Sequence, residues 1–239
     1  MAVAIEDVLP ADWLDLFDPL YPRIGLGLDP ATTTKAKSNP SAFVAIQQLS
    51  LMYFARLVVR FKTDDPEVTK AIMRLILTGL KSKGMHARRL CIAATNERFF
   101  AAACRREFAA LVPVQLVIES EKTEYLGEEM LYKAYLGNLV VNTVEDGYLP
   151  LPPEPWLKKD IRQVVRDKGT FNAEVEDDGG HGDCFVGLGL ALHALKTKGG
   201  PAEASAASTG SYGAGGKPTR KLFNRYASRY VKSGRAQAI

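Results

Sequence analysis

Three apolar runs follow one another closely in residues 23–62 and limit what this part of the chain can form. They are Ile24–Leu28, Ala42–Leu49 and Tyr53–Phe61. The connections between them are too short for helices, so the pattern predicts three antiparallel strands in hairpin order. The fold is therefore expected to start from a sheet.

Helices and strands alternate in the next part of the chain. The segment Thr63-Asp64-Asp65-Pro66 places a capping acid before a proline, which is typical of a helix start, and Gly84 is typical of its end. The later elements are predicted as a strand at Arg89–Ala94, a helix at Asn96–Phe108, a strand at Val114–Ile118 and a helix at Glu121–Leu136. This order predicts an α/β fold with a mixed five-stranded sheet flanked by helices. Strands 1–3 are antiparallel, and strands 4 and 5 run parallel to strand 1, which is central.

The C-terminal part of the domain is expected to add further strands and a helix. Residues 138–175 are less regular and are predicted to hold two short strands around a helix at 156–167. A glycine-rich turn then leads into a last helix from Asp183 to about Lys196. Residues 1–22 are interpreted as an amphipathic arm or linker, and residues 199–239 as a flexible Gly/Ala/Ser-rich linker with a basic tail. Residues 23–198 remain as the folded domain.

The charge is distributed unevenly along the chain. The net charge is +4, but seven Lys/Arg and no Asp/Glu lie in residues 204–239, so residues 1–203 carry −3. An acidic body is not a uniformly basic nucleic-acid binder, and DNA affinity there needs local patches or bound cations. In the tail, Lys221, Arg225 and Arg229 recur at four-residue spacing with aromatic residues between them. Two interpretations stay open: a disordered basic tail, or a helix that forms on DNA or a protein partner.

The cysteines and the apolar runs bear on the compartment. Cys91, Cys104 and Cys184 form no C-x-x-C pair, which favours a reducing compartment and argues against a disulfide scaffold or a zinc site. The sequence shows no signal-peptide pattern, and its longest apolar run, Phe185–Leu192, is far shorter than the roughly 20 residues that span a bilayer. We therefore expect a soluble intracellular protein.

Two acidic residues stand where chemistry is possible. Asp29 ends the first apolar strand, and Asp183 follows a Gly180-His181-Gly182 turn at the start of the last helix, where its side chain is expected to be exposed. Each has a structural alternative, because an Asp before Pro often caps a turn and an acid at a helix start caps free N–H groups. The strand glycines Gly25 and Gly27 are interpreted as sites where another backbone approaches, not as a nucleotide loop. The histidines outside the turn, His86 and His193, are left out of the site, and His193 is expected in the core.

Together the two acids favour a metal-dependent nuclease. In the predicted strand order, an acid at the end of the central strand and an acid on the last helix can meet over one sheet edge. Carboxylate oxygens suit Mg²⁺ or Mn²⁺, and two such ions roughly 4 Å apart can clamp a scissile phosphate. Bound cations also explain how an acidic body tolerates a polyanion.

Five short stretches occur here in a specific order. They are Gly27-Leu28-Asp29-Pro30-Ala31, Asn39-Pro40-Ser41-Ala42-Phe43, Thr95-Asn96-Glu97-Arg98-Phe99, Ser120-Glu121-Lys122-Thr123-Glu124 and Gly180-His181-Gly182-Asp183. In these stretches the chain resembles the nuclease domain of phage large terminase subunits, close to the version in Mu-like transposable phages. The resemblance implies an RNase H-like nuclease domain at 23–198 that uses two Mg²⁺ or Mn²⁺ ions.

The resemblance also assigns roles to residues. It implies that Asp29 and Asp183 bind metal and that His181 lies beside the site. The family's acid at the end of the fourth strand falls on Ala93, a vacant ligand position that Glu97 or Glu119 could fill. Each glutamate can also be interpreted as an ordinary surface acid. Alternatively, Ala93 indicates a lost ligand and an impaired enzyme that still binds DNA. The candidate DNA-binding residues are Lys35, Lys37, Arg98, Lys122, Lys221, Arg225 and Arg229.

The function implied is cutting of concatemeric viral DNA during genome packaging. The expected partners are double-stranded DNA, the terminase small subunit, the portal and the ATPase domain of the motor, in the cytoplasm of an infected bacterial host and without a membrane. The Gly213–Thr219 stretch is no phosphate loop, because its first glycine is misplaced and a proline follows the lysine. The motor is thus expected elsewhere. Two alternatives stay open: a Holliday-junction-resolvase-like nuclease, and a non-catalytic DNA-binding or docking module.

Overall fold

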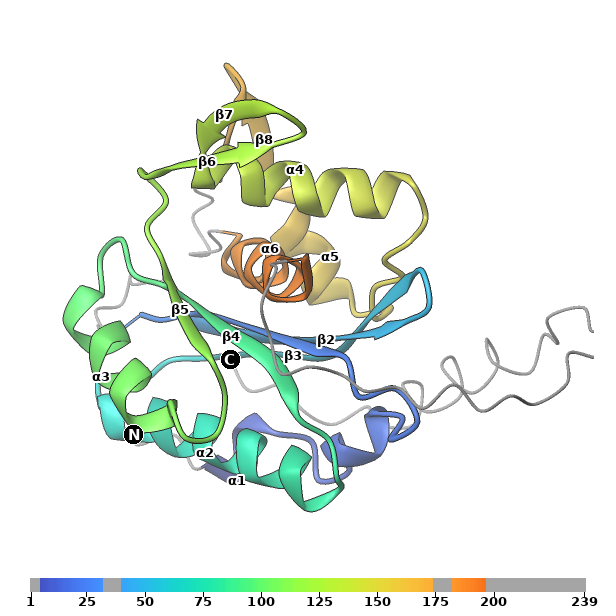
Figure 1. Ribbon diagram of the computed structural model, residues 1–239, viewed down its shortest axis with the longest axis vertical. Coiled ribbons are helices and arrows are strands. Elements are labelled where there is room, and N and C mark those ends of the chain that lie inside the picture. The colour runs from blue at the N-terminus through green and yellow to red at the C-terminus, as the bar shows by residue number, and fades with distance from the viewer. Residues whose placement is uncertain (1–4, 32–39, 174–181, 197–239) are drawn as a thin grey trace, which may run out of the picture. The chain divides into compact units, whose positions relative to one another are not determined.

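A mixed five-stranded sheet forms the centre of the protein (Figure 1). The computed structural model describes residues 5–31, 40–173 and 182–196. The strands are β1 (Ile24–Asp29), β2 (Ser41–Leu49), β3 (Met52–Phe61), β4 (Ala87–Ala93) and β5 (Val114–Val117). Their order is β3-β2-β1-β4-β5, with β1–β2 and β2–β3 antiparallel and β1–β4 and β4–β5 parallel. The predicted topology, with the first strand central, is confirmed.

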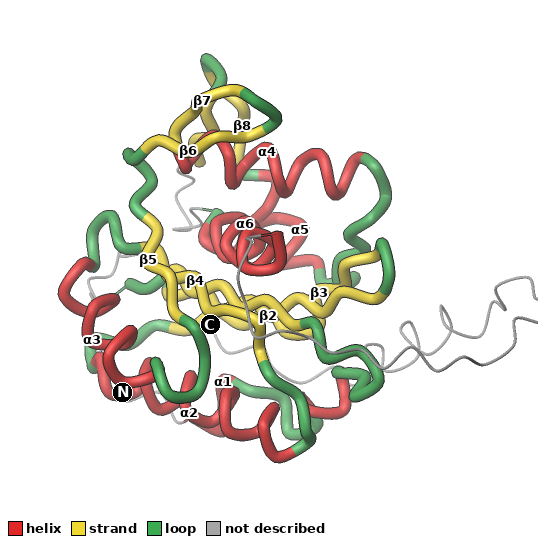
Figure 2. Tube along the Cα trace, in the orientation of Figure 1, coloured by secondary structure: helices red, strands yellow, loops and turns green. Residues whose placement is uncertain are grey.

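One face of the sheet is covered by α2 (Pro66–Ser82) and α3 (Arg98–Phe108) (Figure 2). The start of α2 is as predicted, because the side chain of Asp65 accepts a hydrogen bond from the backbone N–H of Glu67 over 2.8 Å and Pro66 follows it. The short helices α1 (Ile5–Val8) and η1 (Trp13–Leu16) precede the sheet. The side chains of Trp13 and Phe17 lie in the same core as α2, so this segment is packed against the domain.

The other face carries α4 (Tyr132–Glu145), α5 (Pro155–Arg162) and α6 (Asp183–Lys196). Helix α6 lies next to the sheet and is buried on almost every side, as expected for a helix that is apolar all round. A Cβ built on Gly27 would come within 2.2 Å of the carbonyl oxygen of Gly187 in α6. The prediction that the glycines of β1 admit another backbone is therefore confirmed, and that backbone belongs to α6.

Two predicted segments were wrong. Residues 121–136 do not form one helix: β6 (Lys122–Tyr125) and β7 (Glu128–Leu131) form a hairpin, and α4 begins only at Tyr132. Both turn residues, Leu126 and Gly127, have positive φ, as a two-residue turn with the twist of a hairpin requires.

The second error concerns the segment after α4. The helix expected at 156–167 ends at Arg162, and the two short strands follow it instead of flanking it. They are β8 (Val164–Asp167) and β9 (Thr170–Ala173). Their turn, Lys168-Gly169, again has positive φ at both residues. In the described parts of the chain, no helix is long and apolar enough to cross a membrane.

Candidate active site

A cavity of about 550 Å³ opens where β1, β4 and β5 end and α6 begins. Every acidic candidate that the structure describes lies in its wall, together with the alanine of the vacant position: Asp29, Ala93, Glu97, Glu119 and Asp183. The parallel arrangement of β1, β4 and β5 explains this gathering, because their carboxyl ends meet at one edge of the sheet.

Asp29 is brought to the cavity by strand alternation. Gly25 and Gly27 face the backbone of α6, and Asp29, two residues further, is on the same face of β1. The pKa of Asp29 is raised well above its ordinary value, first by burial and then by the negative charges of Asp183, Glu119 and Asp160. Because these charges reach Asp29, the acids form one electrostatic cluster.

Asp183 is the first residue of α6 and is only 4% exposed. Our expectation that it is exposed in a glycine-rich turn was therefore wrong: the preceding Gly182, with φ of +70°, turns the chain inward, and α6 is packed between the sheet and α4. The adjacent backbone N–H of Cys184 donates a hydrogen bond of 3.0 Å to Oδ2 of Asp160. Asp160 is 2% exposed, and its Oδ1 lies 3.3 Å from the guanidinium of Arg60.

Glu119 lines the cavity from the turn that follows β5. Ala93 pairs with Val117, the last residue of β5, and Glu119 lies two residues further along the chain. The backbone N–H of Glu119 donates to the hydroxyl of Thr95 over 3.0 Å. Burial raises the pKa of Glu119, and the positive charge of Lys133 offsets part of this increase. Glu97, at the start of α3, lines the same cavity and is half-buried.

Comparison with known proteins gives a result at the level of the fold. No protein-family model matches the chain, and no curated protein matches it. Among solved structures, the nuclease domain of the large terminase subunit gp2 of bacterial virus Sf6 has a TM-score of 0.52 at 11% sequence identity, covering 80% of this chain and 99% of that one. The fold is that of a terminase nuclease domain. The topology is thus the predicted RNase H-like one.

Two further terminase structures are similar. A mutant of the Sf6 domain, solved with calcium, has a TM-score of 0.50 at 10% identity and covers 80% of this chain and 99% of that one. The terminase nuclease domain of human cytomegalovirus has a TM-score of 0.48 at 12% identity and covers 78% and 94% of the two chains. The Mu-like subtype remains a prediction.

Several predicted site residues remain untested. His181, Lys35, Lys37, Lys221, Arg225 and Arg229 lie outside the described residues. Arg98 begins α3 and is exposed, and Lys122 is exposed and paired with Glu129 over 2.6 Å. Neither Arg98 nor Lys122 lines the cavity.

Two residues that the sequence analysis missed belong to the surroundings of the site. Lys133, in the first turn of α4, lines the cavity, and Asp160 holds the start of α6. A lysine in the first turn of a helix is unfavourable, and this could have identified Lys133. The helix was predicted to begin at Glu121 instead of Tyr132, so Lys133 was not recognised as a first-turn residue. Asp160 gave no sequence signal, since it is one acid among several on a short amphipathic helix.

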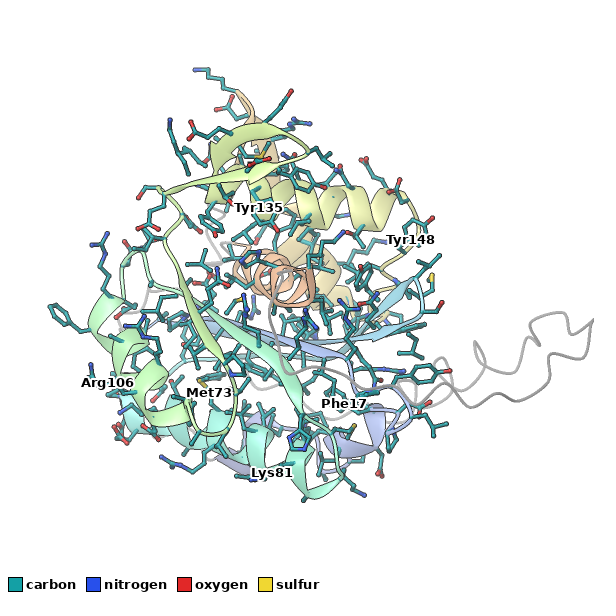
Figure 3. The ribbon with its side chains drawn as sticks, viewed as in Figure 1. Phe17, Met73, Lys81, Arg106, Tyr135 and Tyr148 are labelled. Carbon is teal, nitrogen blue, oxygen red and sulfur yellow. The ribbon has the colours of Figure 1, made fainter. Side chains whose placement is uncertain are left out.

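The remaining expectations concern the core. Figure 3 shows Tyr135 where α4 lies over α6, and its hydroxyl is 3.0 Å from Nδ1 of His193. Burial lowers the pKa of His193 to about 4, so His193 is the core histidine that we predicted. Cys91, Cys104 and Cys184 are buried free thiols.

Proposed function

We propose that this chain is a metal-dependent endodeoxyribonuclease that cuts concatemeric viral DNA during genome packaging. The observation that carries the proposal is the convergence of Asp29, Glu119 and Asp183 on one cavity of a terminase nuclease fold. Three acids from β1, the turn after β5 and the start of α6 offer only oxygen donors, which are the ligands that Mg²⁺ and Mn²⁺ prefer.

The electrostatics of the cavity fit a divalent cation. Burial and neighbouring acids raise the pKa of Asp29, so the ionised cluster is unfavourable until positive charge enters it. The mutant Sf6 domain was solved with calcium, another hard cation that oxygen ligands bind. We infer that Asp29 and Asp183 would hold the metal, with Glu119 replacing the acid that position 93 lacks.

The chemistry would be hydrolysis of a phosphodiester. When bound, two Mg²⁺ or Mn²⁺ ions supply an activated nucleophile and stabilise the leaving oxygen. The residues of the chain fix the geometry for this reaction. Asp29 is held by the β1 backbone, Asp183 by the first turn of α6, and Glu119 by its hydrogen bond to Thr95.

A plasmid-nicking assay with Mn²⁺ tests the proposal. We expect nicking by the full chain and loss of nicking in Asp29→Asn, Asp183→Asn and Glu119→Gln, with Mn²⁺ affinity measured by calorimetry in parallel. Glu128→Gln is the matched control, because Glu128 is an exposed acid of β7 outside the cavity. Loss of activity in the control alone, or full activity in all three cavity variants, would contradict the proposal.

A non-catalytic DNA-binding or docking module is the second candidate. It is favoured by Ala93, which offers no ligand oxygen, and by the finding that no three His, Cys, Asp or Glu side chains among the described residues lie close enough to form a ready metal-ligand group. This candidate predicts DNA binding without any Mn²⁺ binding. Calorimetric titration of the full chain with Mn²⁺ separates the two functions.

We also infer a place in a packaging assembly. The partners would be double-stranded DNA, the terminase small subunit, the portal and the motor ATPase domain, in the cytoplasm of an infected bacterium. The support is the terminase fold together with the basic residues of 204–239. Reconstitution with a cognate motor ATPase, measured as coupled DNA translocation and cutting, tests this placement.

A further inference from the structure

The positive charge of Lys133 is unusually placed. Among the described residues that line the cavity, Lys133 is the only lysine or arginine. Its backbone N–H donates to the carbonyl oxygen of Glu119 over 3.1 Å, so the lysine is anchored to the turn that follows β5. The site therefore faces its substrate with acids on one part of the wall and one cation on another.

Helix stability does not explain this lysine. Lys133 is the second residue of α4, whose first turn contains no acid and whose cap position has no side-chain hydrogen bond. A cation in the first turn of a helix opposes the helix dipole and destabilises the helix start. Because Lys133 destabilises the helix start and lines the cavity, a role in the cavity explains its presence better than a role in the helix.

The ammonium group is held without being neutralised. Its Nζ donates a hydrogen bond of 2.9 Å to the amide oxygen of Asn172 in β9, and within the described part of the chain it forms no ion pair. A neutral amide fixes the direction of the ammonium group without pairing its charge, and that charge also acts on Glu119 within the cavity. In a cavity whose other polar residues are mainly acids, the partner that matches this charge is an anion.

We propose that Lys133 is a catalytic residue that binds a non-bridging oxygen of the scissile phosphate. This inference rests on the proposed nuclease function. Lys133 is anchored to the backbone of Glu119, so its positive charge lies in the cavity wall next to a proposed metal ligand, where the scissile phosphate would bind. A fixed cation stabilises the charge that the phosphate develops in the transition state.

The test compares three variants of the full chain. Lys133→Met removes the charge and keeps the length, and Lys133→Arg keeps the charge. Lys81→Gln is the matched control, since Lys81 is an exposed lysine on α2, on the opposite side of the sheet (Figure 3). Circular dichroism and thermal melting establish that all three are folded.

Single-turnover cleavage with Mn²⁺ is the first readout. We expect Lys133→Met to cut at least about 100-fold more slowly than Lys81→Gln, as when one transition-state donor is lost, and Lys133→Arg to recover part of the rate. Mn²⁺ affinity should not fall in Lys133→Met. If cleavage in Lys133→Met is within about 3-fold of the control, or if Mn²⁺ affinity falls together with cleavage, the phosphate role is overturned.

DNA binding in EDTA is the second readout and does not depend on cleavage. The slope of log affinity against log salt for a short duplex should become shallower by about one in Lys133→Met and stay unchanged in Lys81→Gln relative to the wild type, as expected for one lost phosphate contact. If the wild-type chain neither binds Mn²⁺ nor cuts, the nuclease function fails. The salt slope then still decides whether Lys133 contacts phosphate, and an unchanged slope overturns the inference.

Discussion

Oδ2 of Asp160 accepts a hydrogen bond from the backbone N–H of Cys184 over 3.0 Å. Cys184 follows Asp183 directly, so α5 holds the turn of α6 that carries a cavity acid. The second oxygen of Asp160 lies 3.3 Å from Arg60 of β3, which also places its guanidinium over the ring of Trp156. The backbone next to Asp183 is thus tied to β3, at the edge of the sheet, through one buried carboxylate.

Replacing Asp160 tests this link. We expect Asp160→Ala to lower the free energy of unfolding by about 2 kcal/mol, because a helix cap and a hydrogen bond to a charged acceptor are lost. Mn²⁺ affinity should fall as well, since Asp183 loses its support. Asp160→Asn keeps an acceptor oxygen and should lose less of both. Urea unfolding and calorimetry measure the two effects, and an unchanged Mn²⁺ affinity in a folded Asp160→Ala protein would contradict the positioning role.

The raised pKa of Asp29 predicts a pH dependence of stability in the metal-free protein. An acid whose folded-state pKa exceeds its unfolded value binds more protons when folded, so its contribution is fully present below the ordinary pKa of 3.8 and is lost as pH rises through the raised value. In EDTA, the wild type should therefore lose stability relative to Asp29→Asn as pH rises above about 4, by at most about 1.4 kcal/mol per pH unit. Thermal melts of both proteins from pH 4 to 8 check this. Parallel curves would show that the pKa of Asp29 is not raised.

The contact between β1 and α6 predicts that position 27 does not tolerate any residue larger than glycine. An added Cβ would lie 2.2 Å from one backbone atom of α6 and 2.7 Å from another, and neither can move by rotation of a side chain. Gly27→Ala should cost at least about 3 kcal/mol, because overpacking against backbone must displace the helix. Gly84→Asn is the control, since Gly84 has φ of +72° with open space around it and asparagine tolerates that conformation. Denaturant unfolding should leave the control within about 1 kcal/mol of wild type.

Position 93 offers a gain-of-function test. Ala93 is 9% exposed and lines the cavity beside Glu119, so an acid there would point toward Asp29 and Asp183. We predict that Ala93→Asp tightens Mn²⁺ binding and raises Mn²⁺-dependent nicking. Ala93→Asn, of similar size without the charge, is the control. If Ala93→Asp has no effect while Glu119→Gln or Glu97→Gln removes activity, that glutamate is the third ligand and position 93 is not vacant.

The sheet was predictable because each of its strands is an apolar run of ordinary strand length. The hairpin of β6 and β7 was not, because residues 121–131 are rich in glutamate, which is compatible with a helix, and the Leu126-Gly127 turn lacks the usual Asn-Gly or Asp-Gly signal. Tyr125 and Met130 pack against the core formed by α4 and α6, so tertiary contacts decide the structure there.

The site was predictable only where local sequence carried a signal. Asp29 ends β1 and Asp183 begins α6, each shortly after glycines, and both were found. Lys133 and Asp160 depend on partners 39 and 24 residues away, Asn172 and Cys184, and nothing local identifies such pairs. The burial of Asp183 was missed for the same reason, because it follows from how α6 packs and not from its glycine-rich turn.

The position of α6 has a consequence for synthesis on the ribosome. Asp29 is made early and Asp183 late, because β1 is the first strand of the domain and α6 the last helix that the structure describes. A nascent chain adds about 5–20 residues per second, so the two acids cannot meet until every intervening element has been translated. A product truncated before α6 lacks one cavity acid and leaves the glycine face of β1 without its cover. The cavity is thus complete only after the last described helix has been made, so under the proposed function a prematurely terminated chain would misfold and would not cut DNA.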